Sequence, residues 1–167
     1  MKKRIFSVTV ENNSGVLSRV AGLFARRGFN IDSLSVGETE NPRLSRMTIV
    51  SQGDDHTLTQ IKNQLAKLIE VVSIEELSHE DVVVREYVLI RMSCSAESRS
   101  QIIDLTHIFR ANIVDVSESS LIVELTGTPS KISAFIKLAQ PLGLTELVRT
   151  GTTAMKRGQG EDADWID

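Results

Sequence analysis

The feature of this sequence that most constrains its fold is an order of six elements that occurs twice. Apolar residues alternate in some stretches and recur at steps of three and four in others, in the order strand, helix, strand, strand, helix, strand. This order is typical of the split βαβ, or ferredoxin-like, arrangement, in which two helices cover one face of a four-stranded antiparallel sheet. We therefore predict an α+β protein with two ferredoxin-like βαββαβ domains in tandem.

The first predicted domain spans residues 1–77. Alternation such as Phe6, Val8 and Val10 marks its strands, and Gly28 is well placed to end its first helix in a left-handed conformation. Its strands are predicted at 5–10, 29–36, 44–51 and 71–77, and its helices at 15–27 and 58–69. The helix-free face of this sheet would need a cover, so a homodimer through these domains is expected.

The second predicted domain spans residues 82–157 and follows a polar linker at 78–81. Its strands are predicted at 85–94, 113–116, 121–125 and 144–150, and its helices at 102–109 and 129–139. Residues 158–167 form an acidic, glycine-containing end, which we expect to be a frayed tail with Trp165 exposed.

Composition and charge restrict the class of protein. Hydrophobic residues make up 41% and charged residues 25%, which is the balance of a globular domain. The formal net charge of −3 gives no bulk attraction to nucleic acid, and no run of about 18 apolar residues could span a membrane. Cys94 is the single cysteine, so no intramolecular disulfide can form. We predict a cytoplasmic protein that binds neither nucleic acid nor membranes.

The residue types that commonly carry catalysis or bind metals are dispersed. His56, His79 and His107 have no metal-site spacing, and Cys94 lies on a predicted core face without a C-x-x-C partner. No nucleophile elbow of the form G-x-S-x-G and no G-x-G-x-x-G dinucleotide motif occurs. We therefore predict that the chain is not itself an enzyme and holds no metal or cofactor.

One turn carries most of the functional signal. The stretch 11–17 joins the first predicted strand to the first predicted helix, with Asn12 to Ser14 at the expected cap and Gly15 at the bend. A helix N-terminus presents unpaired N–H groups and the positive end of the helix dipole, which suits a small anion such as a carboxylate. An ordinary helix cap would explain the asparagine and serine equally well.

A second asparagine extends this candidate site. Asn30 begins the strand that follows the helix, and the split βαβ fold can bring that strand beside the turn. The side chains of Asn12 and Asn30 could then serve both the ammonium and the carboxylate of a free amino acid. The candidate effector-binding residues are Asn12, Gly15, Val16, Leu17, Asn30 and Ile31. The second domain has residues 95–98 in place of the turn, so only the first domain is expected to bind an effector, an aliphatic zwitterion.

Several separate motifs resemble a known family. The domain order and the turn at 11–17 resemble an ACT domain, the small-molecule sensing module of amino-acid metabolism. Over roughly residues 1–157 the chain resembles the small regulatory subunit of acetolactate synthase (acetohydroxyacid synthase). The motifs that carry this resemblance lie at 22–34, 44–49, 85–86, 108–111, 126–132 and 149–151.

The resemblance implies a regulatory function. Subunits of this family bind a catalytic subunit that carries thiamine diphosphate, FAD and Mg²⁺, raise its activity, and make it sensitive to feedback inhibition by branched-chain amino acids, chiefly valine. Their effector sites lie at the interface between two ACT domains. Matched onto this sequence, Asn12, Gly15, Val16 and Leu17 fall in the effector loop, and Asn30 and Ile31 fall on the neighbouring strand.

Two other functions fit parts of the pattern. A transcription regulator with ACT-like sensing domains would need a DNA-binding element, and neither half shows a helix-turn-helix segment or a basic patch. A small metal-dependent enzyme or metal sensor would need clustered ligands, whereas one cysteine and three dispersed histidines are available. Valine, leucine and isoleucine remain alternative effectors, because one methylene separates their affinities by only about 1–3 kcal/mol.

Overall fold

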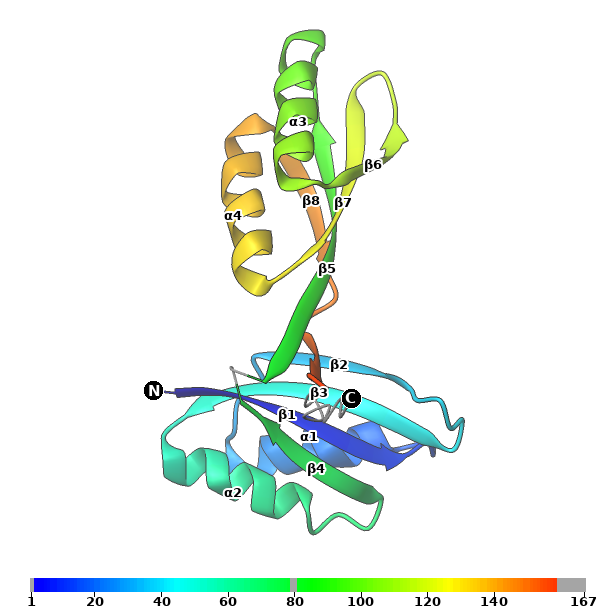
Figure 1. Ribbon diagram of the computed structural model, residues 1–167, viewed down its shortest axis with the longest axis vertical. Helices are drawn as coiled ribbons and strands as arrows, with labels where there is room; N and C mark the ends of the chain where they lie inside the picture. The colour runs from blue at the N-terminus through cyan, green and yellow to red at the C-terminus, as the bar shows by residue number, and fades with distance from the viewer. Residues whose placement is uncertain (1, 79–80, 159–167) are drawn as a thin grey trace, which may run out of the picture. The chain divides into compact units, whose positions relative to one another are not determined.

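The computed structural model describes residues 2–78 and 81–158, which form two compact units (Figure 1). Unit 1 comprises residues 2–32, 36–83 and 154–158, and unit 2 comprises Ser33–Ser35 and residues 84–153. We predicted a linker at residues 78–81, whereas the two compact units divide after Val83, and residues 154–158 group with the first unit. Residues 159–167 of the predicted tail, including Trp165, lie outside the described residues.

Unit 1 has the predicted order of two helices and four strands. Its elements are β1 (Lys2–Glu11), α1 (Val16–Arg27), β2 (Ser33–Glu38), β3 (Leu44–Gly53), α2 (Asp55–Leu65) and β4 (Val71–Leu77). The sheet order is β2-β3-β1-β4, and β1 runs antiparallel to both of its neighbours. This is the βαββαβ arrangement, so the predicted fold class is confirmed for this unit.

The core of unit 1 follows from strand alternation. Phe6 and Val8 on β1 lie opposite Ile49 and Met47 on β3, and all four side chains are buried. Val20, Leu23 and Phe24 of α1 and Leu58, Ile61 and Leu65 of α2 supply the helical side of this core. The alternate residues of the strands point to the other face of the sheet.

Two predicted boundaries in unit 1 are wrong. We predicted helix to residue 69, but α2 ends at Leu65, and consecutive turns lead from there into β4. Ile69 is 94% exposed, so its spacing from Leu65 imitates a helical face without packing against the core. We also predicted a strand from residue 29, whereas β2 begins at Ser33. The left-handed Gly28 ends α1, and the Phe29 amide still donates to the Phe24 carbonyl at 3.0 Å, which keeps Phe29 against the helix.

Unit 2 repeats the topology. Its elements are β5 (Val82–Ser93), α3 (Ala96–Phe109), β6 (Asn112–Val116), β7 (Ser120–Gly127), α4 (Pro129–Ala139), the 3₁₀ turn Gln140–Leu142 and β8 (Leu144–Arg149). The order β6-β7-β5-β8 matches that of the first sheet, which confirms the tandem prediction. A short strand that we did not predict, β9 (Thr153–Lys156), pairs with β5.

The core of unit 2 is mostly aliphatic. One pair of rings contributes to it, since Phe109 of α3 packs edge to face on Phe135 of α4 with ring centroids 5.3 Å apart. Val88, Ile90 and Met92 alternate along β5 and are fully buried. Cys94 joins this cluster as a buried free thiol, as its position on a predicted core face indicated.

Candidate effector site

The N-terminus of α1 differs from those of the other α-helices in the described chain. Its N-cap is Gly15, with a φ of 83°, and no side chain caps it. In contrast, Asp54, Ser95 and Thr128 accept hydrogen bonds from backbone amides at the starts of α2, α3 and α4. The Thr57 hydrogen bonds also hold the pKa of Asp54 below its ordinary value. We predicted an asparagine or serine cap for α1, and that prediction is wrong.

The glycine explains the missing cap. A φ of 83° is strained for residues with a side chain and favours glycine. With Gly15 in this conformation, no side chain of the described residues caps the first turn of α1, although the Val16 amide donates to the Asn13 carbonyl at 3.4 Å. The start of the helix therefore lacks a side-chain acceptor and carries the positive end of the helix dipole, which is a suitable place for a carboxylate.

Asn12 holds the loop in place. Its amide nitrogen donates to Glu38 Oε1 at 3.1 Å and to the Pro42 carbonyl at 3.0 Å, and its amide oxygen accepts from the Ser45 hydroxyl at 3.0 Å. The Asn12 backbone amide also donates to the carbonyl of Arg43 at 2.8 Å. The side chain thus ties the loop to the ends of β2 and β3, a positioning role that the sequence did not indicate.

Asn30 lies at the opposite end of α1 from Gly15. The 12 residues of α1 span about 18 Å at 1.5 Å per residue, and Asn30 follows the helix while Gly15 precedes it. The Asn30 carbonyl accepts from the Ser51 hydroxyl at 2.6 Å, whereas the effector loop is bonded to the other end of β3. We expected the fold to bring Asn30 beside the turn. That expectation is wrong within one chain, because the helix separates the two positions.

The three aliphatic candidates have different environments. Val16 is 3% exposed and belongs to the core of unit 1, so it supports the loop from beneath. Leu17 is 43% exposed and is available for contact. Ile31 is half-buried beside Asn30, at the far end of α1. The N-terminal end of α1 therefore presents Gly15 and Leu17 for contact with an effector, and its C-terminal end presents Asn30 and Ile31.

Comparisons with known proteins match both units of the chain. Residues 6–73 match the family model of the AHAS small subunit-like ACT domain, and residues 85–158 match that of the small subunit of acetolactate synthase. A protein of Archaeoglobus fulgidus, named as a probable acetolactate synthase small subunit, is 55% identical over 156 residues that cover 93% of this chain and 98% of that protein. This chain belongs to the acetolactate synthase small subunit family.

Further relatives agree with this assignment. The acetolactate synthase small subunit of Mycobacterium bovis is 48% identical over 157 residues, which are 94% of each chain. The crystal structure of the acetolactate synthase small subunit of Thermotoga maritima superposes with a TM-score of 0.90 and 44% identity, over 95% of this chain and 99% of that one. The chain is thus similar to these small subunits over nearly its whole length.

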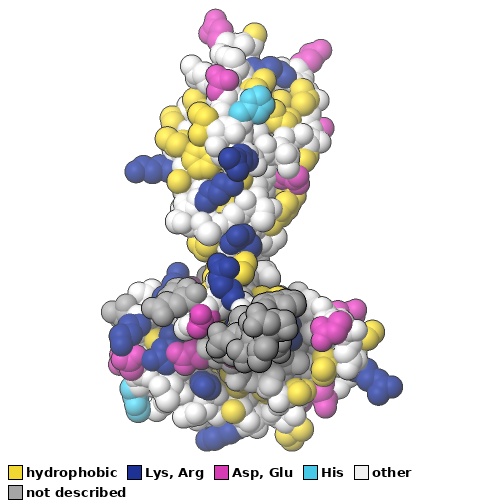
Figure 2. All heavy atoms as spheres, viewed as in Figure 1, with side chains coloured by type: hydrophobic (Ala, Val, Ile, Leu, Met, Phe, Trp, Pro, Cys, Tyr) yellow, Lys and Arg dark blue, Asp and Glu magenta, His cyan; other side chains and the backbone are white. Residues whose placement is uncertain are grey.

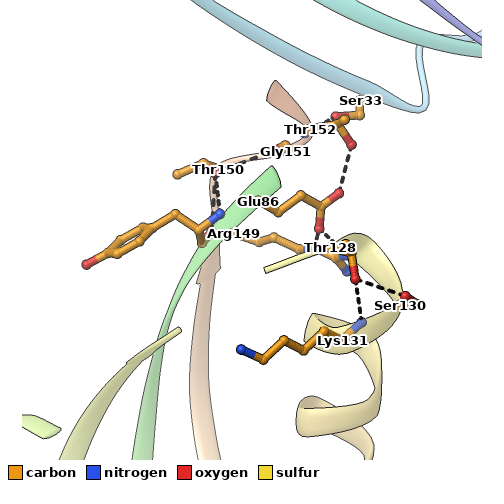
Figure 3. A network of polar contacts seen from close by, with 10 residues as sticks. Ser33, Glu86, Thr128, Ser130, Lys131, Arg149, Thr150, Gly151 and Thr152 are labelled. Carbon is orange, nitrogen blue, oxygen red and sulfur yellow. Dashed lines mark hydrogen bonds and ion pairs between the residues drawn. The ribbon is translucent and has the colours of Figure 1, made fainter. Parts of the chain in front are cut away.

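Two family motifs meet in unit 2. Glu86 and Arg149, from the motifs at 85–86 and 149–151, lie side by side, and Arg149 Nε donates to Glu86 Oε2 at 2.6 Å (Figure 3). The other carboxylate oxygen of Glu86 accepts from the Thr152 hydroxyl at 2.8 Å. The backbone amide of Thr152 donates to the Ser33 hydroxyl at 2.7 Å. The Glu86 side chain is 6% exposed, so this is a buried carboxylate with both oxygens bonded.

One face of unit 1 carries side chains of both charges, with basic and acidic residues interspersed (Figure 2). Within residues 2–78 and 81–158, no three His, Cys, Asp or Glu side chains gather closely enough to hold a metal ion. The helices of the same residues include none with the length and hydrophobicity needed to cross a bilayer.

Proposed function

We propose that this chain regulates acetolactate synthase by binding the catalytic subunit, raising its activity and making it subject to feedback inhibition by valine. The single observation that carries the effector assignment is the start of α1, where Gly15 at a φ of 83° leaves the helix without a side-chain cap. A free amino acid can place its carboxylate there without displacing a protein group. Family membership supports the regulatory role.

The effector site is shared between two chains in this proposal. Gly15 and Asn30 stand at opposite ends of α1, too far apart to contact one small amino acid. A two-fold axis pairs each surface patch with its own copy, so it can set the loop end of one α1 against the Asn30 end of the other. The outer edge of β2 is unpaired among the described strands and supplies a pairing surface for a homodimer of unit 1.

The bound effector is expected to be valine or another branched-chain amino acid. Backbone N–H groups at the start of α1 donate to its carboxylate, and the Asn30 amide oxygen accepts a hydrogen bond from its ammonium group. Leu17 of one chain and Ile31 of the other supply the apolar contacts for its side chain. These groups are neutral as a set and match a zwitterion with an aliphatic side chain.

Regulation then follows from linkage. Valine that binds across two chains favours one arrangement of the paired ACT domains, and the catalytic subunit responds to that arrangement. If valine changes the affinity of the chain for the catalytic subunit by a given factor, the catalytic subunit must change the affinity for valine by the same factor. Thiamine diphosphate, FAD and Mg²⁺ belong to the catalytic subunit in this proposal, and the transferase reaction occurs there, in the cytoplasm. Reconstitution with that subunit, measuring acetolactate formation with and without valine, tests the whole proposal.

Replacing Asn30 with alanine is expected to weaken valine binding by about 1–3 kcal/mol, because the ammonium group loses a polar partner in a desolvated site. Isothermal titration calorimetry with valine measures the change. Asn112→Ala is the matched control, since Asn112 occupies the equivalent position in unit 2. Its side-chain amide donates to the Glu124 carboxylate at 3.1 Å, as the Asn30 amide donates to the Asp32 carboxylate at 2.7 Å. Equal valine affinities for the two variants would contradict the role of Asn30.

A further inference from the structure

A polar groove lies on the helix-free face of the sheet in unit 1. Its volume is about 150 Å³, and strands β1, β3 and β4 line it together with residues 154–156. The polar side chains that line it are Ser7, Thr9, Arg46, Ser73, Glu75 and Lys156. None of them belongs to the candidate effector site.

Strand register brings the polar groups of this groove together. Thr9 on β1 lies directly opposite Arg46 on β3 and directly opposite Ser73 on β4. Opposite residues on one face have Cβ atoms about 4.5–5.5 Å apart, so the guanidinium of Arg46 and the two hydroxyls form one row across three strands. Ser7 adds a third hydroxyl in the next row, opposite Glu75.

The same face changes character along its length. Ile5, Val50 and Leu77 form a neighbouring row across the three strands, and all three are buried. This row is a buried apolar part of the sheet face and offers no polar groups to a ligand. The hydroxyl and guanidinium row therefore marks the part of the face that is available to a polar ligand.

The charge of the groove favours an anion. The Lys156 ammonium is 3.3 Å from Glu75 Oε1, which balances one positive charge. Arg46 is exposed and forms no ion pair within the described chain, so a net positive charge remains beside the hydroxyls. A guanidinium with nearby hydroxyl donors is well suited to carboxylate and phosphate oxygens.

We propose that this groove binds a small oxyanion, a carboxylate or a phosphate, through Arg46 and the hydroxyls of Thr9 and Ser73. Its volume is below the roughly 300–1,000 Å³ of pockets for drug-sized ligands, which restricts the ligand to a small ion. The motif at 44–49, which the effector site does not use, then has a function: Arg46 is its ligand-binding residue.

Calorimetric titration of the full chain with inorganic phosphate, and separately with acetate, tests this proposal at constant ionic strength. We expect saturable binding of at least one of the two anions, and the comparison identifies the preferred oxyanion. Arg46→Gln should weaken that binding at least about tenfold, because a charge-assisted contact is lost. Arg26→Gln is the matched control, since it removes the same charge from the last turn of α1, on the helix-covered side of the sheet.

A second variant is expected to act in the opposite direction. Glu75→Gln removes a negative charge from the groove and releases Lys156, so anion affinity should rise about two- to fivefold. A residue with a purely structural role would not strengthen binding when it is replaced. Gly15→Asp should leave anion binding unchanged, because the α1 terminus is not part of the groove.

Three results would overturn the proposal. These are no saturable binding of either anion, unchanged affinity in Arg46→Gln, or loss of anion binding in Gly15→Asp. The last result would place the anion at the start of α1. If the groove does not bind an anion, the valine titrations are unaffected, so the two proposals are tested independently.

Discussion

Replacing Gly15 with aspartate is expected to lower the affinity of the full chain for valine by about a hundredfold or more. The new carboxylate would stand where the effector carboxylate is proposed to bind, at the uncapped start of α1. Two like charges about 4 Å apart repel by ~4 kcal/mol at an effective dielectric constant of 20. Isothermal titration calorimetry with valine measures this loss, and reconstituted acetolactate synthase should become insensitive to valine.

Gly15→Asn separates charge from backbone strain in that experiment. Any side chain at a φ of 83° adds up to about 1–2 kcal/mol of strain, and asparagine tolerates this region best. Asparagine has nearly the shape of aspartate without its charge, so Gly15→Asn should keep much of the valine affinity. If the two variants bind valine equally, or if Gly15→Asp binds it as well as the unmodified chain, the site assignment is wrong.

Replacing Arg149 with methionine is expected to reduce the free energy of unfolding of unit 2 by about 3 kcal/mol, because it leaves the buried Glu86 carboxylate without its cation. Arg149 is 35% exposed, so water can replace part of the lost interaction and the cost falls at the lower end of the range for buried pairs. Urea denaturation followed by circular dichroism, with hydrogen exchange to identify the unit that unfolds, measures the effect.

Arg91→Met is the matched control for that substitution. Arg91 lies in the same sheet and pairs with Glu146 at 3.0 Å, but both side chains are largely exposed. Its replacement should therefore cost no more than about 1 kcal/mol. Adding Glu86→Gln to Arg149→Met removes the stranded charge and should restore much of the stability. Equal costs for Arg149→Met and Arg91→Met would show that burial of Glu86 does not matter.

The fold was predictable because its evidence is local. Alternation along β1 and β5, and apolar steps of three and four along α1 and α4, are properties of neighbouring residues. Their order then leaves few topologies, and the ferredoxin-like arrangement is the one observed in both units. The errors in the first domain have a local cause as well. Ile69 continues the apolar spacing of α2 without being part of its buried face.

The site was only partly predictable because its geometry is long-range. The glycine at the turn was visible in the sequence, but its φ of 83°, and hence the missing cap, was not. The distance between Gly15 and Asn30 depends on the direction of α1 across the sheet. Likewise, Glu86 and Arg149 are 63 residues apart, so no local pattern could pair them. Their occurrence in two motifs of the family resemblance was the only signal for that network.

The length of α1 has a consequence for mixtures of variants. If each effector site combines the loop end of one chain with the Asn30 end of the other, a Gly15→Asp chain and an Asn30→Ala chain damage different halves. In a heterodimer of the two, both defects fall in the same site, and the second site consists of intact halves. In that heterodimer, two chains that each bind valine more weakly alone would together restore one of the two sites, which is complementation between alleles of one gene.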